Sequence, residues 1–131
     1  MKNPIYKEEY DYIFSRKAHS VRGASVVSAF IEAQILLLAK SFLESHVVKY
    51  EPKQHQEYRQ SLNVLETNGL LSKPEIRQIE AFWKERNKAI HGPFKGMTRE
   101  QWGKQNNKVV DLGRPIVKVL DSKIKSQENS Q

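Results

Sequence analysis

Apolar residues recur at helical spacing along most of this 131-residue chain. The clearest run follows a period of 3.6 residues and consists of Ala24, Val27, Phe30, Ile31, Ile35, Leu38 and Phe42. Val and Ile keep this spacing elsewhere and do not alternate with polar residues, so we expect helices and little or no sheet. Ala33, Leu36 and Leu37 widen the apolar face of the run, which predicts a helix buried on most of its sides.

Caps, glycines and prolines predict where the helices begin and end. We expect one helix over residues 4–18 and a second that contains the apolar run and ends near Tyr50, before Pro52. Further helices are expected over residues 54–67, over residues 72–91, and from residue 98 onward. Asn68-Gly69 is a typical helix stop.

Two further signals concern the second half of the chain. The segments 72–75 (Ser-Lys-Pro-Glu) and 98–101 (Thr-Arg-Glu-Gln) are capping boxes, each of which opens a helix. Gly92 is expected to be the left-handed cap of the helix that ends at His91, and Pro93 disfavours its continuation. Gly113 and Pro115 predict a kink or a break in the last helix.

Short connections between these segments favour antiparallel neighbours. The expected fold class is therefore all-α, a single-domain antiparallel bundle of four to five helices. A chain of this length accommodates one modest core. We expect the helical domain to cover residues 1–121 and the polar residues 122–131 to form a frayed tail.

Composition narrows the classes of function. The chain contains no cysteine, which excludes a disulfide framework, a thiolate metal site and a cysteine nucleophile. No signal-peptide pattern follows the start, and the apolar stretch 35–39 is shorter than the roughly 20 residues that cross a bilayer, so we expect a cytoplasmic protein without a membrane partner. The formal net charge of +7 attracts polyanions, of which nucleic acid is the commonest. His19, His46 and His55 lack ligand-like spacing, so no metal site is expected.

Arg86 interrupts the apolar stripe of the segment 74–91, because it lies three residues after Trp83 and four before Ile90. A guanidinium on an apolar face is costly unless it is paired or the face opens into a cleft. Asn87 and His91, four residues apart, share one side of the helix. Arg86 and His91 lie about 140° apart around an ideal helix, so Arg86 approaches His91 either by its long side chain or by meeting a His91 from another chain. The spacing favours a site that a second chain completes.

The trio Arg86, Asn87 and His91 suits the cleavage of RNA by the neighbouring 2′-hydroxyl. The carbonyls at the helix end favour the imidazolium of His91 by about 0.3–1 kcal/mol, which suits proton transfer near neutral pH. The planar guanidinium of Arg86 matches a phosphate and stabilises the charge that develops on it. Asn87 orients the phosphate or the imidazole. This chemistry requires no metal and no other cofactor.

Arg86-Asn87, followed after three residues by His91, resembles the Arg-x4-6-His motif of the HEPN superfamily. In that motif a polar residue, often Asn, follows the arginine, and Gly92 after the histidine is also familiar from many members. The resemblance implies a metal-independent endoribonuclease in which Arg86 and His91 are catalytic and Asn87 assists. It also implies a homodimer in which two motif helices form one cleft, and Glu32 as an acidic partner of the arginine.

The resemblance further implies a toxin or defence effector that acts on RNA and is restrained by a cognate antitoxin or regulatory protein. Five basic residues around the motif are expected either to track the RNA backbone or to form a plain solvated face: Lys84, Lys88, Lys95, Arg99 and Lys104. Three aromatic residues are expected either to stack on bases or to belong to the core, namely Phe82, Trp83 and Trp102. For Trp83, the core is the better expectation.

Three other interpretations remain open at this point. The chain could be a non-catalytic HEPN-like module that binds RNA or a partner protein. It could be a helix-turn-helix protein that binds DNA, although no short helix pair with a tight glycine turn is evident. Without the resemblance, His91 is a capping residue and Arg86 an arginine whose side chain extends out of the core.

Overall fold

Helices form every regular element of the part of the chain that the structure describes. That part is residues 4–45 and 57–129 of a computed structural model. The elements are α1 (Pro4–Ile13), a 3₁₀ helix (Arg16–Ala18), α2 (Val21–Ser45), α3 (Glu57–Thr67), α4 (Lys73–His91), a second 3₁₀ helix (Gly92–Lys95) and α5 (Arg99–Asn129). The prediction of an all-α helical bundle is confirmed.

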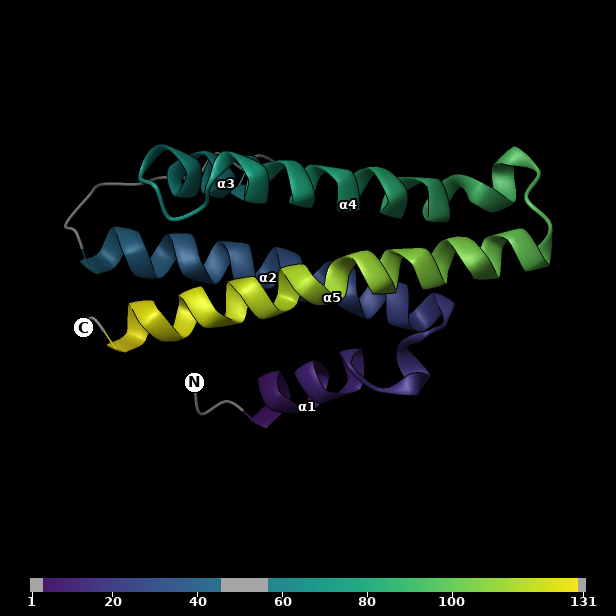
Figure 1. Cartoon of the computed structure of the whole chain (residues 1–131), viewed down its shortest axis with the longest axis horizontal. Helices are drawn as coiled ribbons and strands as arrows, with labels where there is room; N and C mark the ends of the chain where they lie inside the picture. Colours follow the sequence, from purple (N-terminus) through teal and green to yellow (C-terminus); the bar gives the residue numbers. More distant parts are fainter. Residues whose placement is uncertain (1–3, 46–56, 130–131) are drawn as a thin grey trace.

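The two longest helices, α2 and α5, pack along each other in the middle of the molecule (Figure 1). Helices α3 and α4 cover one side of this pair, and α1 lies on the opposite side. Their apolar faces meet in one core, as the helical period of the sequence requires. The largest fully buried side chains come from five elements and include Ile13, Ile31, Leu38, Leu65, Phe82 and Leu120.

Gly113 allows α5 to approach α2 and α4 closely. A Cβ atom at this position would lie 2.3 Å from Val27 Cγ1 and 2.8 Å from Phe82 Cε1. Helix α5 continues through Gly113 and Pro115 as a single element. The predicted break is therefore absent, because core contacts on both sides hold this segment helical.

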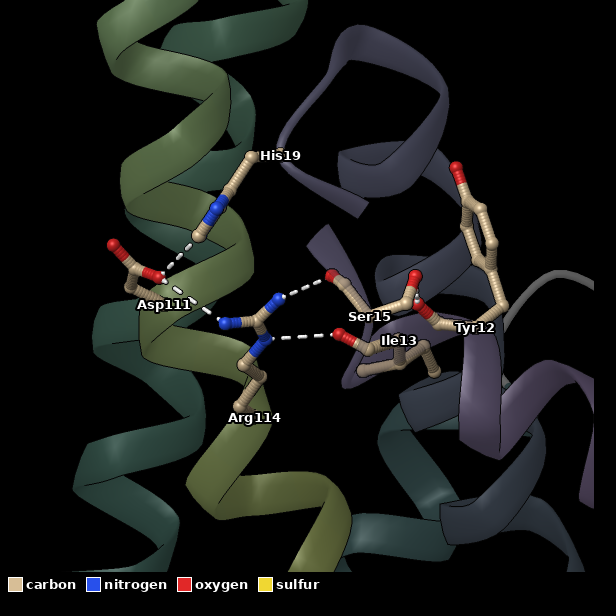
Figure 2. Close-up of polar contacts among 6 residues, drawn as sticks. All are labelled: Tyr12, Ile13, Ser15, His19, Asp111 and Arg114. Carbon is tan, nitrogen blue, oxygen red and sulfur yellow. Dashed lines mark hydrogen bonds and ion pairs between the residues drawn. The ribbon is translucent and has the colours of Figure 1, made fainter. Parts of the chain in front are cut away.

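The first predicted helix is shorter than expected, because a residue far along the chain ends it. Arg114 of α5 donates from Nε to the carbonyl of Ile13 at 2.8 Å and from Nη2 to the carbonyl of Ser15 at 2.9 Å (Figure 2). These bonds satisfy carbonyls that a helix end leaves free. Beside Arg114, Asp111 contacts Nε2 of His19 at 2.7 Å. The chain then turns through the 3₁₀ helix Arg16–Ala18 into α2.

The predicted caps are confirmed with one correction. Both bonds of the Ser72–Glu75 box form, at 2.8 and 3.3 Å. Both bonds of the box at residues 98–101 also form, at 2.9 and 3.1 Å. Gly92, however, is not the left-handed cap: its φ is −51°. The left-handed residue is Gly96, with φ 80°, which ends the 3₁₀ helix Gly92–Lys95 that extends the chain beyond α4.

The end of α5 also differs from expectation. The helix continues to Asn129, whereas the sequence predicts a frayed tail from Ser122. Ile124 is only 3% exposed, and Gln127 donates to Ser45 Oγ at 2.9 Å. These contacts fix the segment against α2.

Helix α2 is long and apolar enough to cross a membrane by length and composition alone. Its most apolar 18-residue window has a mean hydropathy of 1.7. Half of that window is buried inside the protein, and the core helix of a soluble bundle meets the same criterion. The apolar part of this helix is therefore longer than the stretch 35–39. The predicted end of the helix near Tyr50 and Pro52, together with His46 and His55, lies outside the described residues.

Candidate active site

The segment 86–91 forms the end of α4, and α5 holds this end in place. Trp102 donates from Nε1 to the carbonyl of Ala89 at 2.6 Å. The last four carbonyls of a helix accept no hydrogen bond within that helix, and the carbonyl of Ala89 is one of these four in α4. One turn further along α5, Gln105 donates from Nε2 to the carbonyl of Glu85 at 2.9 Å. The two bonds fix the helix on either side of Arg86.

The backbone of Gly92 is ordinary right-handed helix, so close packing, and not backbone conformation, distinguishes this position. A Cβ atom on Gly92 would lie 2.5 Å from Met97 Sδ and 3.1 Å from Trp102 Cδ1. The missing side chain therefore lets the Trp102 indole sit directly beside the end of α4. The sequence did not identify Trp102 as an anchor, because its partner is a backbone carbonyl.

A cleft of about 200 Å³ lies between α2, α4 and α5. Arg86 of α4 and Glu32 of α2 both line it. The Arg86 guanidinium carbon lies 4.9 Å from the centre of the Trp83 ring, and Nη1 donates to Asn87 Oδ1 at 3.3 Å. The interruption of the apolar stripe is thus accommodated at the wall of a cleft.

Arg86 and Glu32 both line this cleft, but the two side chains form no ion pair in the part of the chain that the structure describes. The pairing that the resemblance implies is therefore not formed directly, because Trp83 and Asn87 hold the guanidinium instead. Glu32 acts on another neighbour. Burial raises the pKa of the Tyr58 hydroxyl, and the negative charges of Glu32 and Glu80 raise it further.

His91 is the last residue of α4, and it is exposed. Its ring makes no hydrogen bond or ion pair with any described residue. On an ideal helix, His91 falls about 140° from Arg86 and about 40° from Asn87. The lining residues agree with this separation, since Arg86 lines the cleft whereas Asn87 lines a second groove between α3 and α4. One chain thus presents Arg86 and His91 on different sides of the helix.

The five basic residues expected around the motif fall into two groups. Lys88 pairs with Glu85 at 3.1 Å, and Lys104 pairs with Glu100 at 3.4 Å. The other three are exposed and form no ion pair among the described residues: Lys84, Lys95 and Arg99. Ion pairs within the chain therefore neutralise part of the predicted basic surface.

Glu85 is a buried carboxylate that the sequence interpretation did not single out. It is 8% exposed and accepts from Lys108 at 2.7 Å as well as from Lys88. Hydrogen bonds from Lys108 and from Lys88 hold the pKa of this carboxyl below its ordinary value. The bond from Lys108 joins α5 to α4 one residue before Arg86 and helps to fix the wall of the cleft.

The three candidate aromatic residues have different environments. Phe82 is fully buried, so it is a core residue and is not available for stacking on a base. Trp83 is half-buried, and its indole N–H donates to the Tyr58 hydroxyl. Trp102 is half-buried and anchors α4 as described.

Exposed apolar side chains lie at the cleft and in the 3₁₀ helix that follows α4. Val21 and Ile90 line the cleft and are 42% and 46% exposed. Phe94, four residues after Ile90, is 90% exposed. Large apolar side chains this open to water are candidates for contact with another protein surface.

Comparisons of this chain with protein-family models, with curated proteins and with solved structures give no match. In the part of the chain that the structure describes, no group of three histidine or acidic side chains is arranged to hold a metal ion.

Proposed function

We propose that this protein is a metal-independent endoribonuclease of the HEPN type that acts as a homodimer. One observation carries the proposal. Arg86 lines a cleft without a carboxylate partner among the described residues, bonds the adjacent Asn87, and lies five residues before an exposed histidine at the end of the same helix. Such a guanidinium is available for a phosphate, and such an imidazole is available for proton transfer.

The proposed reaction is attack of the RNA 2′-hydroxyl on the adjacent phosphorus. An imidazole removes the 2′-hydroxyl proton as the new P–O bond forms. The P–O5′ bond then breaks, and an imidazolium, either that of the same histidine or that of the second copy's histidine, gives its proton to the departing oxygen. Arg86 stabilises the extra negative charge on the phosphate, and Asn87 holds the Arg86 side chain in position through their hydrogen bond. The products are a 2′,3′-cyclic phosphate and a 5′-hydroxyl.

A second copy of the chain would complete this site. Within one chain Arg86 faces the cleft and His91 lies on the other side of α4, so one phosphate does not easily reach both. Two α4 helices that face each other would bring His91 of each copy to the cleft. Ile90 and Phe94 are exposed beside this position and supply apolar surface for the contact.

The biological role follows from the resemblance alone. We propose a cytoplasmic toxin or defence effector whose activity a cognate antitoxin or regulatory protein restrains. Free ribonuclease activity would harm the cell that makes it, which gives such a regulator a function.

The proposed function is tested by RNA cleavage in excess EDTA. We compare the wild type with His91→Ala and, as a matched control, with His19→Ala, which removes another histidine near the surface. General acid–base catalysis contributes roughly 10²–10⁴-fold, so the His91→Ala variant should be slower by about that factor, while His19→Ala should cut normally. Equal cleavage by wild type and His91→Ala, or a requirement for Mg²⁺, contradicts the proposal. RNA that is bound but left intact by the wild type would support the non-catalytic alternative.

Mixing two inactive variants tests whether the site is shared between copies. In a dimer of Arg86→Ala with His91→Ala, one shared site has an intact arginine from one copy and an intact histidine from the other. Mixing should therefore restore part of the activity that each variant lacks alone. No recovery, with exchange of subunits verified by sedimentation of labelled chains, would place the whole site within one chain.

A further inference from the structure

A second groove, larger than the cleft at Arg86, runs between α3 and α4 and has a volume of about 650 Å³. This volume lies within the range of typical small-molecule sites, roughly 300–1,000 Å³, whereas the cleft is smaller than that range. We propose that the groove holds a base of the RNA next to the cleaved phosphate, which would make it the site that selects the sequence. The proposal rests on the proposed function and extends it to the substrate.

The groove leads along α4 to His91. Glu80, Lys84 and Asn87 line it at successive spacings of four and three residues, and so form one stripe of the helix. His91 is the next residue on this stripe, four residues or about 6 Å beyond Asn87. A nucleotide seated in the groove therefore lies beside the imidazole that would act on its neighbouring ribose.

Asn87 connects the groove to the cleft. It lines the groove and accepts a hydrogen bond from Arg86, which lines the cleft on the other side of α4. A ligand that engages the Asn87 amide in the groove would therefore act directly on the position of the guanidinium. This contact gives the groove a physical link to the catalytic arginine.

The charge of the groove suits a neutral base better than a phosphate. Two basic side chains and two carboxylates line it, namely Arg59, Lys84, Glu66 and Glu80. The formal net charge of these groups is zero, so the groove as a whole does not attract an anion. Polar edges are nevertheless abundant, because Asn63 and Asn87 each offer an amide donor and an amide acceptor. Amides and carboxylates of this kind read the edges of bases.

Aromatic side chains form a fixed wall of the groove. Tyr58 and Trp83 meet edge to face, with ring centres 5.4 Å apart and an angle of 77° between the planes. The indole N–H of Trp83 donates to the Tyr58 hydroxyl, and Arg86 covers the Trp83 ring. Proteins that recognise single-stranded RNA place splayed bases against aromatic and guanidinium groups in this manner.

The test fills the groove from an exposed position. Asn63→Trp places an indole at the groove wall of α3, and Gln78→Trp places the same side chain on α4 outside both the groove and the cleft. Each is made in the wild type, for cleavage, and in His91→Ala, for binding without cleavage. Binding is measured by fluorescence anisotropy with short labelled RNAs of A, C or U, and the cut sites in a random RNA pool are read by sequencing.

We expect Asn63→Trp to weaken RNA binding by about tenfold, since one base loses its contacts, and to change the nucleotide preference beside the cut. Gln78→Trp should leave both properties unchanged. The milder Asn63→Ala, which removes the amide without adding bulk, should change the preference even if Asn63→Trp does not fold. Unchanged affinity and preference in the Asn63 variants would overturn the proposal.

The outcomes also separate this proposal from the proposed function. If neither the wild type nor any variant cuts RNA, the ribonuclease proposal fails. The RNA-binding measurements alone then test whether the groove holds a base. If RNA is cut but the Asn63 variants behave as the wild type, the ribonuclease proposal stands and the groove serves another occupant, such as a peptide of a partner protein.

Discussion

Two glycines in α5 provide a matched test of the packing that forms the cleft. A Cβ atom at Gly113 would overlap Val27 and Phe82, at 2.3 and 2.8 Å, whereas a Cβ atom at Gly103 would meet no atom within 4 Å. Both residues lie inside the same helix. The substitutions Gly113→Ala and Gly103→Ala therefore share the gain in helix propensity and differ in the overlap.

The magnitudes follow from these two terms. Alanine in place of glycine stabilises a helix interior by about 0.8–1 kcal/mol, which is the whole effect expected at Gly103. At Gly113 the overlap costs about 1–3 kcal/mol, so the net change is a destabilisation of up to about 2 kcal/mol. For a chain of this length, 1 kcal/mol shifts the Tm by roughly 3–4 °C. Gly103→Ala should melt about 3 °C above the wild type, and Gly113→Ala up to about 8 °C below it.

The assay is thermal unfolding followed by circular dichroism at 222 nm, with urea titration to confirm the order. If Gly113→Ala is stabilised as much as Gly103→Ala, α5 does not approach α2 and α4 as described. The walls of the cleft at Arg86 would then be placed wrongly, because the same approach sets the distance between these helices.

Three further predictions concern the site. Glu85→Gln removes a carboxylate whose folded-state pKa is lowered by Lys108 and Lys88, so its stabilisation is present above its ordinary pKa of 4.5 and is lost as the pH falls through the lowered value. In urea titrations the wild type should be more stable than the variant at neutral pH and should lose that advantage progressively as the pH is lowered below 4.5, and a difference that does not depend on pH would refute this. Trp102→Phe removes the donor to the Ala89 carbonyl, which should lower the free energy of unfolding by about 1–2 kcal/mol. It should also slow RNA cleavage with the KM for RNA little changed, and cleavage at the wild-type rate would show that Trp102 does not position α4. Phe94→Glu places a charge at an exposed position, so the fold should persist. Sedimentation at micromolar concentration should then show monomers, and these monomers should no longer cut RNA. A monomer that still cuts RNA would remove the need for a shared site.

Local signals in the sequence predicted the helices well where the partners lie close along the chain. The two capping boxes at Ser72 and Thr98 each involve residues three apart, and both form as expected. The apolar period of the second helix also places most of its core residues correctly, because burial follows the face of a helix. Two residues differ from the prediction, since Phe42 is only half-buried and Ala33 is exposed.

Contacts between distant residues explain what the sequence did not predict. The first helix ends at Ile13 because Arg114, a hundred residues away, bonds its last carbonyls. The packing roles of Gly92 and Gly113 depend on Trp102 and Phe82, which no local pattern connects to them. Such contacts depend on the tertiary arrangement alone.

The candidate site shows the same division. The spacing of Arg86, Asn87 and His91 predicted that Asn87 and His91 share a face that Arg86 does not. The lining of the cleft and the groove separates Arg86 from Asn87, and His91 is not among the lining residues of either. The sequence did not reveal Glu85 or Trp102, which hold α4 through an ion pair with Lys108 and a hydrogen bond to a backbone carbonyl. It also suggested a direct contact between Arg86 and Glu32, whereas the two residues share a cleft without pairing.

The central claim is that His91 catalyses attack by the RNA 2′-hydroxyl. The most direct measurement compares one RNA with the same RNA carrying a single 2′-deoxy nucleotide at the cut, each incubated in EDTA with wild type and with His91→Ala. We expect the wild type to cut only the unmodified RNA and to leave a 2′,3′-cyclic phosphate, and His91→Ala to be slower by roughly 10²-fold or more. Cleavage of both RNAs at the same site, or equal rates for the two proteins, would contradict it.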